Sequence, residues 1–275
     1  MAKLPPKQHP LSELLENGLV EQEYRPYIGM SGILGKCPRY LWYQFYWAYE
    51  RKINRRTDRI FKRGDIEESR VVADLRSIGC HVTECEEDQT EIVDGTGHIK
   101  GHKDGRVTSI PGATLAPHLL EVKTMKQAQY TKFLKEGLAR SHPYYWGQIH
   151  TYMGEEGFGH CLFVVCNKDT EHRRYVFYTY DENVHKDCIS IAHGVLMSEY
   201  PPEKIAPKPT WFECKICDAV GICHNGEAIK RTCRSCKHAN IENEGQWSCE
   251  LYVQWLNEED QMKACQDYKL SEVFS

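Results

Sequence analysis

Single apolar residues set between polar ones recur in short runs through the middle of the chain, and turn-forming dipeptides separate these runs. Asp94-Gly95 and Pro111-Gly112 are two such dipeptides. The runs predict strands at 81–84, 91–93, 98–103, 105–109 and 118–124. A longer apolar run predicts a buried strand at 161–167, and an alternating run predicts its partner at 175–180.

Helices are predicted on either side of these strands. An aromatic-rich stretch predicts a helix from Cys37 toward Tyr49, and a second helix is predicted over 65–78, preceded by Gly64 and ended by Gly79. Further helices are predicted at 11–19, 126–137 and 144–153, and another ends within 194–200. The order of helix, antiparallel strands, helix and strand predicts a mixed α/β core.

Composition limits the kind of protein that the chain can be. Its 275 residues suit one large domain and a small appendage, and 41% hydrophobic and 27% charged residues are ordinary for a globular protein. No apolar run approaches the length of a membrane span, and the first residues lack the apolar core of a signal peptide. We therefore expect a cytoplasmic protein.

One segment is strongly basic although the chain as a whole is not. The net charge of −4 argues against binding nucleic acid over the whole surface. Only Asp58 opposes the basic residues of this segment, which are Arg51, Lys52, Arg55, Arg56, Arg59, Lys62 and Arg63. A solvated charged face would explain the segment, but its position just before the helix predicted at 65–78 favours contact with phosphates.

The strand predicted at 118–124 and the turn before it carry the residues expected for metal-dependent phosphodiester cleavage. Asp104 stands at a strand-to-turn junction, and alternation along the strand places Glu121 and Lys123 on one face. Asp104, Glu121 and the Val122 carbonyl could hold Mg²⁺ or Mn²⁺. Lys123 could orient the attacking water or stabilise the developing charge. The alternative explanation of Glu-x-Lys is a surface ion pair on an edge strand.

Two flanking helices extend this group. Glu68 is predicted to share a helical stripe with three apolar residues, whereas Glu67 is predicted further from its centre, so Glu68 is the expected metal ligand and Glu67 the alternative. Gln148 and Tyr152 are one helical turn apart and could hold a DNA backbone or nucleotide near the metals. Structural explanations remain open as well. Glu68 could be an ordinary first-turn glutamate, and Gln148 and Tyr152 could belong to a partly buried helix face.

Thirteen cysteines are many for a chain without export features, and clustered cysteines in a reducing compartment usually indicate metal. The first group joins Cys37 to Cys214, Cys217 and Cys223, and four thiolates suit either zinc or an iron–sulfur cluster. The remaining cysteines outside both groups are expected to be packing residues: Cys80, Cys85, Cys161, Cys166 and Cys188.

The second group consists of Cys233, Cys236, Cys249 and Cys265, with His238 and His224 as substitutes. Its first pair has the spacing of a zinc knuckle, and the step to the third cysteine resembles a small zinc ribbon. This pattern favours a bound Zn²⁺ over unliganded thiols. Basic residues nearby could meet DNA, although a solvated face explains them equally well.

The combination of motifs resembles the PD-(D/E)XK superfamily, in particular RecB-like and phage recombination exonucleases. The matching residues lie within about 31–225 and are Gly64, Glu68, Asp104, Glu121-x-Lys123 and Gln148-x-x-x-Tyr152. The resemblance implies a restriction-endonuclease-like core, a mixed sheet flanked by helices, and DNA cleavage that depends on Mg²⁺ or Mn²⁺. Many relatives carry histidine at the position of Glu68, but some phage-type members carry glutamate, so this departure changes the subfamily rather than the chemistry.

The first cysteine group is similar to the iron–sulfur staple of RecB-like nucleases, including those of CRISPR adaptation. One cysteine before the core and three after it, with Cys37-Pro38-Arg39, carry that likeness and imply a 4Fe–4S cluster. We therefore expect a nuclease domain over 1–226, closed by this staple, and a small cysteine-rich, zinc-binding domain over 227–275.

The expected activity is that of a 5′-to-3′ exonuclease acting on linear DNA ends in phage-type recombination or DNA processing. Its partners would be DNA and a single-strand annealing or recombination protein. The alternatives are an end-trimming nuclease of the CRISPR-adaptation kind and a catalytically inactive DNA-binding module of the same fold. Intact Asp104, Glu121 and Lys123 argue against the inactive module.

Overall fold

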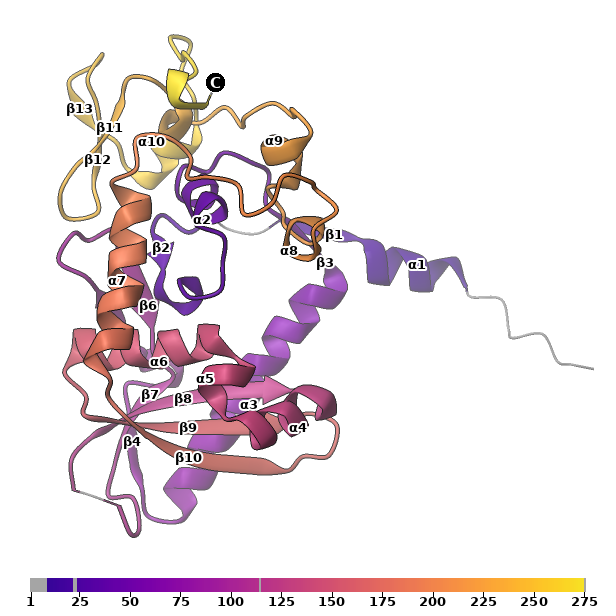
Figure 1. Cartoon of the computed structure of the whole chain (residues 1–275), viewed down its shortest axis with the longest axis vertical. Helices are drawn as coiled ribbons and strands as arrows, with labels where there is room; N and C mark the ends of the chain where they lie inside the picture. Colours follow the sequence, from indigo (N-terminus) through magenta and orange to yellow (C-terminus); the bar gives the residue numbers. More distant parts are fainter. Residues whose placement is uncertain (1–8, 22–23, 114, 275) are drawn as a thin grey trace, which may run out of the picture.

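A five-stranded sheet occupies the lower half of the protein in the view of Figure 1. The computed structural model describes residues 9–21, 24–113 and 115–274. Along the sheet the strands have the order β10-β9-β8-β7-β4, and only β8 and β9 are parallel neighbours. Their bounds are β4 His81–Thr83, β7 Gly105–Thr108, β8 His118–Met125, β9 His160–Asn167 and β10 Arg173–Thr179.

Helices cover both faces of this sheet, as the predicted mixed α/β core requires. The long helix α3 (Arg55–Ser77) packs on the face that carries Leu120 and Val122. On the other face, with Leu119 and Phe163, lie α4 (Gln127–Glu136) and α6 (Pro143–Glu156). The short α5 (Leu138–Ser141) joins α4 to α6, and α7 (Glu182–Leu196) packs against α6. Alternation along β8 therefore sends its apolar residues into two separate cores.

The start of α3 differs from the prediction. The helix begins at Arg55 rather than Asp65, because the Asn54 side chain caps it by accepting a hydrogen bond from the Thr57 amide at 2.8 Å. Gly64 consequently lies inside the helix and not before it. Beyond the last turn, Gly79 has φ +90°, the conformation expected of a glycine that ends a helix.

Smaller elements surround the sheet and its helices. A second sheet has the order β2-β6-β5, and β1 pairs with β3. The predicted strands that fall in these regions form with small shifts at their ends. The bounds are α1 Pro10–Asn17, β1 Leu19–Glu21, β2 Ile28–Gly29, α2 Pro38–Phe45, β3 Lys52–Asn54, β5 Glu91–Val93, β6 Ile99–His102, α8 Phe212–Lys215 and α9 Val220–His224.

The C-terminal residues form a third sheet, in the order β11-β12-β13, and lie against the rest of the chain. Gly245 donates a backbone hydrogen bond to Thr96 at 3.1 Å, and a Cβ at Gly97 would collide with the Glu244 backbone. Trp247 is part of the main core, so this region is firmly docked, and the boundary predicted at residue 227 stays a prediction. The bounds are β11 Ala239–Ile241, β12 Trp247–Cys249, β13 Gln254–Trp255 and α10 Glu258–Met262. None of the helices described in the chain has both the length and the apolar character to cross a bilayer.

Candidate functional site

The site forms where β7 stops pairing with β8. The last pair of this ladder joins Gly105 to Leu120, so in the described chain the following β8 residues have no strand on that side. Asp104 takes the place of a strand, since its Oδ2 accepts a hydrogen bond from the Val122 amide at 2.7 Å. The N–H and C=O of one strand residue point to the same side, so the Val122 carbonyl also faces Asp104.

Glu121 and Lys123 lie on the face of β8 that meets α6. Glu121 is 0% exposed, and its Oε1 accepts hydrogen bonds from Gln148 Nε2 at 2.6 Å and from Lys123 Nζ. Lys123 Nζ also lies 3.9 Å from Asp104 Oδ2. The other oxygen, Glu121 Oε2, is buried and has no hydrogen-bond partner among the described residues. The structure thus brings together four residues that the sequence motifs singled out.

Gln148 and Tyr152 are adjacent on α6, as their spacing predicts, but both are buried. They are 4% and 2% exposed, respectively, so little of either side chain is accessible for the direct contact with DNA that was predicted. Gln148 instead holds Glu121. Tyr152 lies so close to β6 that a Cβ on Gly101 would come within 2.5 Å of Tyr152 Cε1, and burial raises the pKa of its hydroxyl.

Substituting Gly101→Ala is expected to destabilise the protein and reduce its activity, because the buried Tyr152 ring must move and Gln148 with it. Overpacking of this kind typically lowers the free energy of unfolding by about 1–3 kcal/mol. Urea unfolding of the variant measures the effect. Gly95→Ala is the matched control, since nothing lies within 4 Å of a Cβ added there. Equal stability of the two variants would contradict the close approach of Tyr152.

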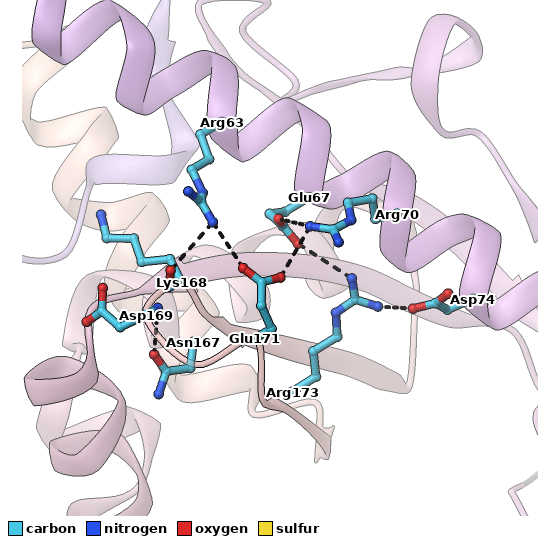
Figure 2. A network of polar contacts seen from close by, with 9 residues as sticks. All are labelled: Arg63, Glu67, Arg70, Asp74, Asn167, Lys168, Asp169, Glu171 and Arg173. Atoms are coloured by element: carbon cyan, nitrogen blue, oxygen red, sulfur yellow. Dashed lines mark hydrogen bonds and ion pairs between the residues drawn. The ribbon is translucent and has the colours of Figure 1, made fainter.

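Glu67 and Glu68 are neighbours on α3 but have different surroundings. Glu67 is 3% exposed; it accepts a hydrogen bond from Arg70 at 2.7 Å and lies 3.5 Å from Arg173. Figure 2 shows these side chains in a network in which Glu171 also takes part. The prediction that Glu68 is the more buried of the pair is therefore wrong: two arginines compensate the charge of Glu67 and allow its burial.

Glu68 faces the site although it is only half-buried. It borders a cavity of about 830 Å³ together with Asp104 and Asp65. Burial, with the negative charge of Asp104, raises the pKa of Glu68 to about 8. Position rather than burial thus favours Glu68 over Glu67 as the acidic residue contributed by α3.

The charges of the site are unbalanced. Burial raises the pKa of Asp104, and burial with the charge of Asp104 raises the pKa of Glu121 to about 8. Burial alone would lower the pKa of Lys123, but Glu121 and Asp104 raise it well above the usual value, so it is the ammonium of the group. With Glu68 included, three carboxyl groups face one ammonium, and a divalent cation bound among them would favour their ionised forms.

Sequence reasoning missed Lys103, the residue before Asp104. Its side chain is fully buried, and Nζ pairs with Glu84 at 2.8 Å and with Glu156 at 2.9 Å. These pairs fix the backbone that crosses from β6 to β7, and with it Asp104. No local pattern could have indicated this role, because the two glutamates come from separate elements.

The first cysteine group converges on one cavity. Cys37 stands at the N-cap of α2, Cys214 and Cys223 lie in α8 and α9, and all three border the cavity of about 260 Å³ with Cys217. Burial raises the pKa of Cys217 to about 11, and nearby thiolates add to the shift. Two further lining atoms, Arg39 Nε and His224 Nε2, are buried without a hydrogen-bond partner in the part of the chain that is described.

The second cysteine group also surrounds a single cavity, of about 20 Å³. Its lining includes His238 and the four predicted cysteines, Cys233, Cys236, Cys249 and Cys265. His224 borders the first cavity instead, so its prediction as a substitute ligand for this group is wrong, because α9 folds back toward α2. The five cysteines outside both groups are buried, as expected for packing residues.

None of these groups is a preformed metal cage. Among residues 9–21, 24–113 and 115–274, no three His, Cys, Asp or Glu side chains are arranged to hold an ion. Magnesium commonly uses one or two carboxylates and keeps several waters, and cysteine must lose its proton before it binds a metal. A metal that binds at the Asp104–Glu121 site or at either cysteine group would therefore draw the ligand side chains of that site closer together.

The comparisons with known proteins give only distant likenesses. No family model matches the chain, and no curated protein matches it. The crystal structure of SSO0001 is 18% identical over 76% of this chain and 90% of its own, with a TM-score of 0.42. The crystal structure of the alkaline exonuclease LHK-Exo from Laribacter hongkongensis is 18% identical over 63% of this chain and 87% of its own, with a TM-score of 0.46. The crystal structure of LHK-Exo in complex with dAMP is 20% identical over 62% of this chain and 86% of its own, also with a TM-score of 0.46.

Proposed function

We propose that this protein is a metal-dependent DNA nuclease whose site is built on Asp104, Glu121 and Lys123. The observation that carries the proposal is Glu121 Oε2, a buried carboxylate oxygen without a hydrogen-bond partner in the described chain. Leaving such an atom unpaired is costly unless a cation meets it. Lys123 Nζ contacts Glu121 Oε1 and lies 3.9 Å from Asp104 Oδ2, so the two carboxyl groups lie close together, and oxygen atoms are the ligands that Mg²⁺ and Mn²⁺ prefer.

The residues around Glu121 suit phosphodiester hydrolysis. A bound Mg²⁺ or Mn²⁺ ion would supply Lewis acidity and a more acidic water. Gln148 holds Glu121 Oε1 and so leaves Oε2 for the ion. Lys123 is kept protonated by its two carboxylate neighbours, and its ammonium can stabilise negative charge that develops on the phosphate.

The first half of α3 suits a nucleic-acid backbone. The same helix carries Glu68 and the exposed basic residues from Arg55 to Arg63. From Arg56 to Glu68 the helix rises about 18 Å, a distance that spans roughly five phosphates of one DNA strand. Arg59 and Arg63 pair with glutamates at the surface, but exposed pairs of this kind are weak, so phosphates can replace those partners.

A 4Fe–4S cluster held by Cys37, Cys214, Cys217 and Cys223 is part of the same proposal. Their cavity of about 260 Å³ is far larger than one ion needs, since about 10–15 Å³ of such volume already holds a water. The unpaired Arg39 Nε could donate to a cluster sulfur. Arg39 also donates hydrogen bonds to Pro201 and Pro202, so the cluster would strengthen a link that is already present between distant segments.

Digestion of labelled DNA tests the activity. With Mg²⁺ present, a 5′-to-3′ exonuclease releases a 5′ label at once as a mononucleotide, shortens 3′-labelled strands progressively and spares a closed circle. Without Mg²⁺ the same DNA stays intact. Equal attack on linear and circular DNA would indicate an endonuclease, and early release of the 3′ label would reverse the polarity.

The biological setting belongs to the same proposal. An exonuclease of this kind would act on linear ends in phage-type recombination or DNA processing, beside a protein that anneals single strands. Trimming only in the presence of a partner protein would favour an adaptation-type enzyme, and DNA binding without cleavage would favour an inactive module.

A further inference from the structure

Arg234 is buried in an aromatic cage that links the C-terminal region to α2. It is 2% exposed, and its guanidinium carbon lies 3.9 Å from the centroid of Trp47 and 4.7 Å from that of Trp247. The Phe45 ring completes the cage at 5.3 Å. Stacking of this kind uses the planar guanidinium, which lysine cannot reproduce.

Hydrogen bonds fix the same side chain from three directions. Arg234 donates to the Phe45 carbonyl at 2.7 Å, to the Pro26 carbonyl at 3.0 Å and to Gln261 Oε1 at 2.7 Å. Among the described residues no carboxylate forms an ion pair with it, so neutral oxygens and ring faces surround the guanidinium, and the charge of Glu258 acts on it only at longer range. A charge buried in this way must be placed accurately to be tolerated, and something must hold the backbone that carries it.

The backbone on both sides of Arg234 belongs to the second cysteine group. Arg234 lies in a 3₁₀ turn between Cys233 and Cys236, and both thiols border the cavity of about 20 Å³. Cys249, at the end of β12, and Cys265, after α10, border the same cavity. Its volume is close to that of a single small occupant and less than a tenth of the first cysteine cavity.

We propose that Cys233, Cys236, Cys249 and Cys265 bind one structural Zn²⁺, and that this ion holds the turn that inserts Arg234 between Trp47 and Trp247. Four thiolates around one ion match the tetrahedral geometry of structural zinc. The turn carries Arg234 into the cage, and β12, which ends at Cys249, carries Trp247. The ion would act on α2 through Arg234, which packs between Trp47 and Trp247. This role concerns stability and is independent of cleavage.

Zinc content tests the site in the full-length protein. Wild-type protein is expected to contain one more equivalent of zinc than the Cys249→Ser variant, as measured by atomic emission. Cys80→Ser is the matched control, because Cys80 is buried in the other core and far from the group in sequence. Equal zinc in the Cys249→Ser and Cys80→Ser variants would overturn the site.

The link to the cage has its own test. Arg234→Lys is expected to keep the zinc and to lower the melting temperature, since the carbonyls and rings lose their planar partner. If the ion acts through Arg234, the double variant with Cys249→Ser melts no lower than Cys249→Ser alone. Additive losses would refute the link.

Zinc removal from the wild type covers the case in which Cys249→Ser does not fold. Amide hydrogen exchange at residues 45–48 is expected to speed up when a chelator strips the ion, because the Arg234 turn then loosens. Unchanged exchange at these residues after complete loss of zinc would equally refute the link.

Discussion

Glu121→Gln is expected to abolish Mg²⁺-dependent cleavage of linear DNA while DNA binding and the fold persist. The substitution keeps the size of the side chain and an oxygen for Gln148, but it removes the carboxyl group that would ionise on binding the cation. Removing one preorganised electrostatic partner of a transition state commonly lowers the rate by about a hundredfold or more. Single-turnover digestion of end-labelled duplex DNA measures the effect, and wild-type digestion by the variant would refute the nuclease proposal.

Two matched variants sharpen this test. Glu155→Gln removes a carboxylate of α6 that pairs with His185 and does not contact the site, and it should leave cleavage unchanged. Glu68→Gln should impair cleavage more strongly than Glu67→Gln, because Glu68 borders the cavity with Asp104 and Glu67 pairs with arginines. A larger loss of activity in Glu67→Gln at equal stability would reverse the assignment.

The pH dependence of stability gives a readout that does not depend on cleavage. The pKa of Glu121 is raised in the folded protein, so the metal-free fold binds this proton more tightly than the unfolded chain does. The stabilisation that the Glu121 proton contributes is fully present below the pKa of about 4 that a glutamate has in the unfolded chain. It is lost as the pH rises through the pKa of about 8 that Glu121 has in the folded protein. Between pH 6 and pH 9 the metal-free wild type should therefore lose more stability than Glu121→Gln.

Cys217→Ala is expected to remove the iron–sulfur cluster and to lower stability strongly. Wild-type protein purified without oxygen should be brown and contain iron and sulfide, whereas the variant should be colourless. A cross-link that closes the long loop from Cys37 to Cys214 would stabilise the fold by up to about 5 kcal/mol in the chain-entropy relation. Absorption spectra, metal analysis and thermal unfolding under anaerobic conditions measure both effects.

Cys80→Ala is the control for this experiment, because its thiol is buried away from the cavity that the first cysteine group borders. Two equivalents of zinc and no iron in the wild type would overturn the iron–sulfur cluster but keep the convergence of the four cysteines. The absence of any metal would refute both metal proposals.

Features that depend on local geometry could be predicted from the residues alone. Alternation along 118–124 was enough to place Glu121 and Lys123 on one face of β8, and Asp104 beside them follows from its position at the end of a strand. The strands of the five-stranded sheet were predicted in their observed order for the same reason, since periodicity along the chain reflects which face is buried. Cysteine spacing likewise separated two groups that the structure gathers around two cavities.

Features that depend on partners far away in sequence could not be predicted in this way. Glu67 is buried because Arg173 approaches it from β10, and helical periodicity holds no information about that contact. Lys103 and Arg234 are buried against the usual preference of charged residues because side chains and carbonyls from other elements compensate them. The unequal volumes of the two cysteine cavities, on which the choice between a cluster and a single ion rests, exist only once the chain has closed around them.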